Sequence, residues 1–229
     1  MRILLGLSVL LASFAAYGAT VTQCGPNVCY EYDDSQVAAS GSYYGLPTLI
    51  GDDMRFLPTT YKAQSTDGVG INTGTNTDTY GSTFVFDRIY SVSGEEIATI
   101  TFTERGDYFV QNDGSVQANM LMLIANNNDA AECDCVLDSF SDSGANALTL
   151  WQLSGSFDAA ANFESLANDV SISLQNTLSA YTDASGEDAW LQKKFMSVSV
   201  TVVPVPAAVW LMGSALGLLV VRARRKMAA

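Results

Sequence analysis

The chain has 229 residues, which allows one ordinary domain together with targeting segments. It carries 11 Lys and Arg against 24 Asp and Glu, a net charge of −13, so nucleic acid is excluded as a partner because such an acidic surface repels it. The absence of histidine excludes Ser-His-Asp and Cys-His catalysis as well as imidazole metal sites, and we predict that the protein is not an enzyme.

Residues 1–18 have the three parts of a secretory signal peptide. A positively charged start is followed by the apolar run Ile3–Phe14 and then by small residues. The run is too short to span a bilayer comfortably, and the small residues Ala16 and Gly18 suit cleavage after Gly18. The sequence therefore predicts an exported protein whose domain occupies residues 19–203.

This domain shows the sequence pattern of β-strands. The predicted strands are Phe84–Tyr90, Ala98–Thr103, Val116–Ile124, Leu148–Leu153, Val170–Leu178 and Met196–Val202. Period-2 alternation and enrichment in threonine, valine and aromatic residues are typical of half-buried strands. Only Asp158–Asn168 resembles a helix, with Asp158 as its cap. Many short strands without βαβ spacing predict an all-β fold, an antiparallel β-sandwich that is jelly-roll-like.

Polar clusters rich in glycine, asparagine and aspartate separate the strands. The predicted turns are Ser93-Gly94, Arg105-Gly106-Asp107, Asn112-Asp113-Gly114, Ser141–Asn146 and Asp183–Gly186. Arg105-Gly106-Asp107 spells an adhesion tripeptide, but its place between Phe102 and Tyr108 favours a simple hairpin turn. The long polar stretch Thr66–Gly81 is expected to be a mobile loop.

Four cysteines form two close pairs, Cys24 with Cys29 and Cys133 with Cys135. An even number in an exported chain indicates disulfides rather than free thiols or a zinc site. The turn Gly25-Pro26-Asn27 would bring the first pair together across a hairpin. Alternate residues such as the second pair lie near the upper limit of Cα separation for a bridge. Three connectivities exist, and we favour two local disulfides.

No cofactor is predicted, but calcium is an alternative because it prefers oxygen ligands in loops. The candidate ligands form two groups: Asn126–Asp129, Glu132, Asp134, Asp138 and Asp142, and Asp183, Glu187 and Asp188. Neither group has EF-hand spacing, and Asx-rich turns form without a bound ion.

Aromatic residues offer a second alternative, a platform on which sugars stack. The candidates are Trp151, Trp190, Tyr43, Tyr44 and Tyr181, although core packing explains the two tryptophans equally well. The alternative function is thus a carbohydrate- or calcium-binding β-sandwich on a single-pass membrane anchor. A third hypothesis is a carboxylate-dependent hydrolase, for which spacing nominates no pair of carboxylates.

The C-terminal segment has the pattern of a membrane anchor. Pro204 and Pro206 precede an apolar run that continues to Val221, and a basic cluster follows, Arg222, Arg224, Arg225 and Lys226. As a helix the run reaches the lower limit of what spans a bilayer. Residues 204–221 are predicted to be a sorting motif with one transmembrane helix, and the basic cluster predicts that residues 222–229 form a cytoplasmic tail.

This tail resembles the VPLPA-CTERM variant of the PEP-CTERM sorting signals of Gram-negative bacteria. The resemblance rests on the basic cluster, on Trp210-Leu211-Met212-Gly213-Ser214, and on the motif Val203, Pro204, Val205, Pro206 and Ala207. Val205 stands where the family name has Leu, and Met212 where Phe is frequent.

The resemblance implies a partner and a location. Such tails are recognised by exosortases, membrane cysteine proteases thought to cut near the motif. It therefore implies an inner-membrane-anchored precursor that reaches the cell surface or the extracellular space. The family's link with exopolysaccharide and biofilm implies a surface or matrix protein with extracellular polysaccharide as a further partner.

Overall fold

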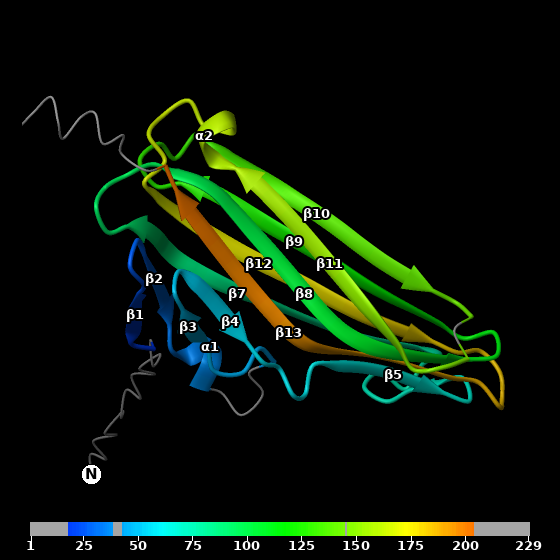
Figure 1. Ribbon diagram of the computed structural model, residues 1–229. Helices are drawn as coiled ribbons and strands as arrows, with labels where there is room; N and C mark the ends of the chain where they lie inside the picture. The colour runs from blue at the N-terminus through cyan, green and yellow to red at the C-terminus, as the bar shows by residue number, and fades with distance from the viewer. Residues whose placement is uncertain (1–17, 39–42, 145, 204–229) are drawn as a thin grey trace, which may run out of the picture.

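The computed structural model describes residues 18–38, 43–144 and 146–203, which form two packed β-sheets (Figure 1). Neighbouring strands in these ranges pair antiparallel throughout. The helical segments of the described residues are the short α1 (Ser35–Ala38) and α2 (Ala159–Asn162). The predicted antiparallel β-sandwich is confirmed.

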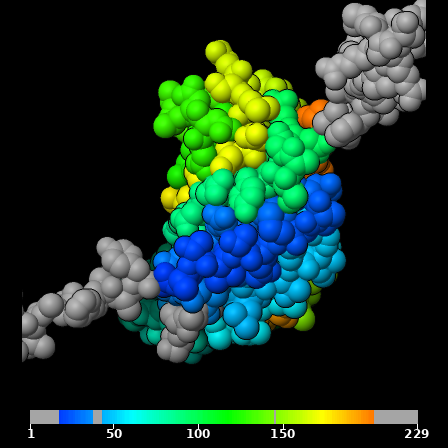
Figure 2. Space-filling view, turned by 90° about the vertical axis from the view of Figure 1, so that its left-hand side faces the viewer, coloured from blue at the N-terminus to red at the C-terminus, as the bar shows by residue number. Residues whose placement is uncertain are grey.

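One sheet has six strands in the order β1-β2-β7-β12-β9-β10. Their bounds are β1 (Thr20–Cys24), β2 (Val28–Asp33), β7 (Thr77–Ser91), β9 (Ser115–Asn126), β10 (Cys133–Asp142) and β12 (Asp169–Tyr181). β12 is paired along its length with β7 on one side and β9 on the other. Figure 2 shows the N-terminal strands, in blue, as a continuous band across one end of the molecule.

The other sheet has seven strands, of which five follow the order β11-β8-β13-β4-β3. Their bounds are β3 (Thr48–Ile50), β4 (Asp53–Phe56), β8 (Ile97–Gln111), β11 (Thr149–Asp158) and β13 (Asp188–Val202). β5 (Lys62–Thr66) pairs with β13 beyond β4, and β6 (Val69–Gly70) pairs with β5. From β7 onward most connections cross from one sheet to the other.

The core lies between the sheets because each long strand turns alternate residues inward. β12, for example, buries Val170, Ile172, Leu174 and Leu178. Aromatic residues fill the part of the core between β2, β4 and β7, where the rings of Phe56 and Phe84 have centroids 4.9 Å apart. The period-2 alternation in the sequence therefore identified the inward faces of these strands.

The predicted turn at Arg105-Gly106-Asp107 is wrong, because these residues lie in the middle of β8. Gly106 is paired with Lys193 on one side and with Trp151 on the other. A Cβ atom at position 106 would lie 1.8 Å from the carbonyl oxygen of Gln192 and 2.6 Å from Nε1 of Trp151. The glycine lets the indole lie across the strand, where Nε1 donates to the Gln192 carbonyl at 3.2 Å.

Two other predicted segments differ in extent from the observed ones. Thr66–Gly81 is not one long loop, because it contains β6 and the beginning of β7. The buried carboxylate of Asp78 orders this segment by accepting hydrogen bonds from the backbone N–H groups of Gln64 (2.8 Å) and Asn72 (2.9 Å).

The predicted helix is limited to α2. Its cap is confirmed, since the Asp158 side chain accepts from the backbone N–H of Ala161 at 3.0 Å. Phe163 has extended backbone dihedral angles and ends the helix after one turn.

One of the two predicted disulfides is present. Cys24 and Cys29 are bonded and face each other across the β1–β2 hairpin, with their Cα atoms 4.0 Å apart. The predicted Cys133–Cys135 disulfide is wrong, because both cysteines are free and exposed. They lie two residues apart on the extended strand β10, which spaces their Cα atoms about 6.6–6.8 Å apart, at the upper limit for a bridge.

The two targeting segments lie almost entirely outside the described residues. Of the predicted signal peptide only Gly18 is described, and of the sorting motif only Val203. The apolar run up to Val221 and the basic cluster Arg222, Arg224, Arg225 and Lys226 are not included. In residues 18–203, as far as they are described, no helix has the length and hydropathy to cross a membrane.

Candidate functional site

The outer face of the seven-stranded sheet carries aromatic side chains that the core does not bury. Trp190 of β13 lies opposite Phe109 of β8 and opposite Gln64 of β5. Directly paired residues of antiparallel strands point to the same face. Ala189 and Leu191 point into the core, so Trp190 and its two partners point outward, half-buried. We call this surface the Trp190 face.

Polar side chains lie over and beside the indole of Trp190. Lys62 places Nζ 4.7 Å from the ring centroid and donates to Oε1 of Gln64 at 2.8 Å. Gln192, next to Lys62 across the strands, donates to the carbonyl oxygen of Thr59 at 3.1 Å. A half-exposed aromatic ring beside amide and ammonium groups combines apolar contact with hydrogen bonding, which suits a ligand that is apolar on one side and polar on its edge.

A hollow of about 470 Å³ adjoins the Trp190 face. It is lined by Arg105, Gly106, Asp107, Leu150, Trp151, Gln152 and Lys194. Lys194 forms an ion pair with Oδ2 of Asp107, while Oδ1 is buried without a hydrogen-bond partner among the described residues. Leu150 is 81% exposed at the edge. The hollow thus combines apolar surface with two cationic side chains, one of which is paired with Asp107.

The five aromatic residues predicted as a sugar platform do not come together. Trp151 and Tyr44 are 3% and 1% exposed and belong to the core. Tyr43 packs edge-on against the ring of Tyr61, and Tyr181 lies on β12 of the opposite sheet. Only Trp190 of the predicted set lies on the outer face of the seven-stranded sheet.

Sequence reasoning missed the partner of Trp190. Phe109 lies between Tyr108 and Val110, both buried, in a part of β8 that the predicted strand Ala98–Thr103 did not include, and the alternation along β8 puts its side chain on the outward face. What alternation did not show was that β8 and β13 pair in the register that brings Phe109 beside Trp190.

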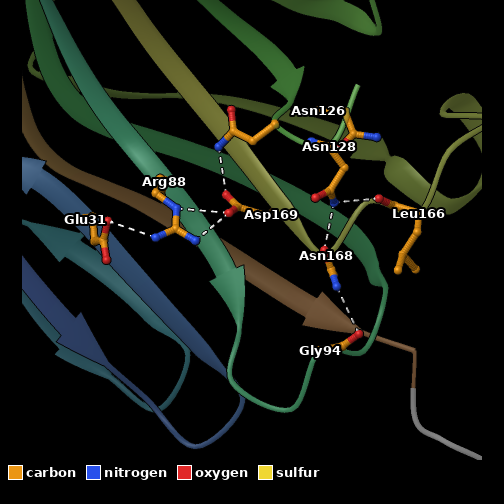
Figure 3. Close-up of polar contacts among 9 residues, drawn as sticks. Glu31, Arg88, Gly94, Asn126, Asn128, Leu166, Asn168 and Asp169 are labelled. Carbon is orange, nitrogen blue, oxygen red and sulfur yellow. Dashed lines mark hydrogen bonds and ion pairs between the residues drawn. The ribbon is translucent and has the colours of Figure 1, made fainter. Parts of the chain in front are cut away.

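The asparagines predicted as calcium ligands form a hydrogen-bond network at one end of the sandwich (Figure 3). Asn127 donates to Oδ1 of Asp169 at 2.7 Å, and Arg88 donates to Oδ2 at 2.6 Å. Asn128 donates to Oδ1 of Asn168 and to the carbonyl oxygen of Leu166, both at 2.8 Å. These contacts join the β9–β10 turn to β7 and to the beginning of β12.

The acidic candidates for calcium are engaged by N–H groups. Glu132 accepts from Nδ2 of Asn126 (2.7 Å) and from the backbone of Glu164 (2.7 Å) and Ser165 (2.9 Å), and these hydrogen bonds hold its pKa below the usual value. Glu187 accepts from the backbone N–H of Asp183 at 2.8 Å. Within the described ranges no three acidic or cysteine side chains are grouped closely enough to hold a metal ion.

The remaining candidates are spread out along the chain. Asp134 and Asp138 lie on β10 and Asp142 at its end, where it accepts a hydrogen bond from the hydroxyl of Tyr108 at 2.7 Å. Asp188 accepts from the hydroxyl of Thr66 at 2.9 Å. The two predicted calcium groups are therefore parts of turns and strand ends that hydrogen bonds already stabilise.

A polar group that the sequence analysis did not identify lies between the two sheets. Lys193 and Glu104 are completely buried, and Nζ of Lys193 donates to Oε1 of Glu104 at 2.6 Å and to Oδ1 of Asn176. The alternation along the two strands did indicate this group. Glu104 lies two residues after Phe102, and Lys193 two residues after Leu191, so both occupy inward-facing positions.

Burial changes the pKa of both charged members of this group. Removal from water raises the pKa of Glu104, and the attraction of Lys193 opposes this shift. Removal from water likewise lowers the pKa of Lys193, and the attraction of Glu104 opposes it. Burial thus favours the neutral form of each group.

Comparison with known proteins leaves the chain without an assigned family. No protein-family model matches it, and no curated protein matches it. Solved structures with some similarity include TmCBM61 in complex with β-1,4-galactotriose, with 8% identity over 83% of this chain and 90% of that chain and a TM-score of 0.26. Another is the N-terminal cellulose-binding domain from Cellulomonas fimi β-1,4-glucanase C, with 19% identity over 69% and 99% and a TM-score of 0.20. These TM-scores are too low to carry an argument about this chain.

Proposed function

We propose that the protein is an exported surface or extracellular-matrix protein that an exosortase-type membrane protease sorts through its C-terminal tail. The observation that carries this proposal is the position of the motif relative to the fold. β13 ends at Val202, and the backbone N–H of Val203 donates to the carbonyl oxygen of Glu96 at 2.7 Å. The prolines of the motif follow immediately, so the sandwich would be displayed directly next to the cleavage site.

The chemistry of the motif fits proteolysis at the membrane surface. Pro204 and Pro206 restrict the backbone to extended, polyproline-like conformations, which a protease accepts more readily than a helix. The apolar run and the basic cluster would then set the depth and orientation at which the motif is presented. Processing would leave the domain at the cell surface or free in the polysaccharide layer.

The test is the C-terminal mass of the protein in its native host. We expect wild-type protein to lack the residues after the motif, and the Pro204→Ala/Pro206→Ala double variant to remain full-length in the membrane. Val205→Leu, which restores the residue of the family name, is the matched control and should be processed normally. Wild-type protein that keeps its whole C-terminus would show an ordinary membrane anchor and refute the sorting proposal.

As a second candidate function, we propose that the Trp190 face binds neutral polysaccharide. Trp190 and Phe109 provide neighbouring aromatic surfaces, and Lys62, Gln64 and Gln192 provide hydrogen-bonding groups around them. The adjoining hollow could receive a further sugar unit. The net charge of −13 disfavours acidic polysaccharides, so a neutral chain is the ligand that charge permits.

Affinity gel electrophoresis with soluble β-1,4-galactan and with a soluble cellulose derivative tests this candidate. We expect retardation of the wild type and a loss of at least about tenfold in affinity, roughly 1.4 kcal/mol, for Trp190→Ala. Tyr90→Ala is the matched control, because Tyr90 also carries a cation over its ring, with Arg88 at 4.5 Å, but lies on the other sheet. Equal retardation of the two variants would refute this second proposal. So would a wild type that no neutral polysaccharide retards.

A further inference from the structure

Lys193, Glu104 and Asn176 bring an amine, a carboxyl group and a carboxamide together inside the core. Glu104 on β8 and Lys193 on β13 come from one sheet, and Asn176 on β12 comes from the other. Lys193 and Glu104 are completely buried, and Asn176 is 2% exposed. The three side chains therefore meet across the space between the sheets, away from water.

The amine of Lys193 contacts both of its partners. Nζ lies 2.6 Å from Oε1 of Glu104 and also donates to Oδ1 of Asn176. The amide carbon Cγ is one carbonyl bond, about 1.2 Å, from that oxygen, so it is within reach of the same nitrogen. Reacting atoms held in contact by a rigid scaffold need little further loss of entropy to react.

Aromatic rings enclose this group. The ring centroids of Tyr61 and Tyr44 lie 4.6 Å and 5.7 Å from Nζ of Lys193. The Tyr61 hydroxyl donates to the backbone carbonyl oxygen of Asn176 at 2.8 Å, which fixes the residue that carries the amide. The surroundings thus exclude water and hold the amide in place.

The group is poorly arranged if its role is only to stabilise the fold. Oε2 of Glu104 and Nδ2 of Asn176 are buried without hydrogen-bond partners among the described residues. Unpaired buried polar atoms are unfavourable, and a buried ion pair often stabilises no more than apolar side chains of similar size. The two unpaired atoms are the ones that a proton transfer to the amide nitrogen would use.

We propose that Lys193 and Asn176 form an intramolecular isopeptide bond between Nζ and Cγ, with Glu104 as the catalytic proton carrier. Glu104 takes a proton from the ammonium group, leaving a neutral amine. Nζ then attacks Cγ and forms the new C–N bond. Glu104 donates its proton to Nδ2 and takes a second proton from Nζ, the bond from Cγ to Nδ2 breaks, and ammonia leaves.

The reaction is balanced without an oxidant, reductant or cofactor. Its reactants are one ammonium, one carboxylate and one primary amide, and its products are one secondary amide, one carboxylic acid and one ammonia. Burial favours the first step, because it lowers the pKa of Lys193 and raises that of Glu104. A neutral amine is the nucleophilic form of lysine, and a buried carboxyl group that stays protonated is an effective acid.

The bond would change how the sandwich resists unfolding. It would remove both charges from the core and join β12 to β13, which are adjacent in the chain but belong to different sheets. Separation of the sheets at this point would then require breaking a covalent bond.

The test is mass spectrometry of the purified, folded full-length chain, both intact and after proteolysis. We expect an intact mass lower than that of the recovered chain's sequence by one ammonia, after allowance for the disulfide and for any removed signal peptide or C-terminal tail. The digest should contain a branched peptide in which Lys193 and Asn176 are joined. Wild-type protein without the loss overturns the proposal, and so does a loss carried by a linear peptide, such as a succinimide at Asn176.

Two variants test whether Glu104 is needed for formation of the bond. Glu104→Gln keeps the shape of the side chain but removes the proton carrier, so we expect the full mass and linear peptides. Glu164→Gln makes the same change at an exposed position and should keep the ammonia loss. A folded Glu104→Gln variant that is fully cross-linked would exclude Glu104 as the proton carrier. If that variant does not fold, the mass of the wild type still shows whether the isopeptide bond forms.

Discussion

At the scale of single residues, individual side chains determine the local geometry of both sheets. Gly106 leaves the space in which the Trp151 indole lies across β8. Glu132 holds the β9–β10 turn against residues 164 and 165 through two hydrogen bonds from their backbone N–H groups and accepts a third from Asn126 within the turn. A substitution at either position should remove this packing or these hydrogen bonds.

Gly106→Ala should destabilise the protein by about 1–3 kcal/mol or more, because the added methyl group would meet the Gln192 backbone and the Trp151 ring. Urea unfolding measures the effect. Gly144→Ala is the matched control, since a Cβ there meets nothing within 4 Å, and its stability should stay within about 0.5 kcal/mol of wild type. Equal stability of the two variants would contradict the packing described for Trp151.

Stability should decrease as the pH falls below the usual pKa of glutamate, about 4.3. Hydrogen bonds from Asn126 and from the backbone of residues 164 and 165 lower the pKa of Glu132 in the folded state. A lowered folded-state pKa contributes stability above the unfolded-state pKa, and that contribution is lost as the pH falls through the folded-state value. Glu132→Gln should weaken the dependence of the free energy of unfolding on pH between about pH 5 and pH 3. If the free energy of unfolding changes with pH as steeply in the variant as in the wild type, Glu132 does not contribute.

At the scale of elements, the β1–β2 hairpin and β10 show why two similar cysteine pairs behave differently. The turn at residues 25–27 places Cys24 and Cys29 opposite each other on separate strands. Cys133 and Cys135 lie on the same strand and pair instead with positions on β9. A disulfide joins the first pair because a hairpin brings its Cα atoms close, whereas an extended strand keeps the second pair apart.

Thiol labelling of the native protein without reductant should therefore modify two cysteines per molecule. Both are exposed on β10, and the other two, which the disulfide joins, should react only after reduction. The Cys133→Ser/Cys135→Ser variant should show no labelling before reduction. Wild-type protein with no reactive thiols would mean that Cys133 and Cys135 are oxidised after all.

At the scale of the whole molecule, a domain built from paired strands is joined to two segments with targeting patterns. The described strands run from Thr20 to Val202, so they begin just after the predicted cleavage site and end just before the sorting motif. The division into residues 1–18, 19–203, 204–221 and 222–229 stays a prediction, because the two targeting segments lie almost entirely outside the described residues.

Removal of residues 1–18 should leave the fold complete, because β1 begins at Thr20. N-terminal sequencing of the exported protein should give Ala19 as the first residue. Ala16→Asp/Gly18→Asp should block cleavage, since the peptidase requires small residues at these positions. Met1 at the N-terminus of the exported wild type would contradict the signal peptide.

Local patterns in the sequence were sufficient to predict the hairpin disulfide and parts of the six strands β7, β8, β9, β11, β12 and β13 with inward-facing residues, but not β1–β6 or β10. Alternation within one strand, as in Val170–Leu178, depends only on the two-residue period of the backbone and needs no knowledge of its neighbours. The turn between Cys24 and Cys29 is equally local. The cap at Asp158 was also predictable, because its hydrogen bond reaches only to Ala161.

Only the tertiary structure decided the features that depend on contacts between distant strands. Gly106 resembles a turn residue in sequence, and its true role follows from Trp151 and Gln192 on the two adjacent strands. The Trp190 face depends on strand register, which places Phe109 beside Trp190. The meeting of Lys193 with Asn176 depends on the packing of one sheet on the other. Sequence patterns specify which way each side chain points, but strand register and sheet packing specify what it meets.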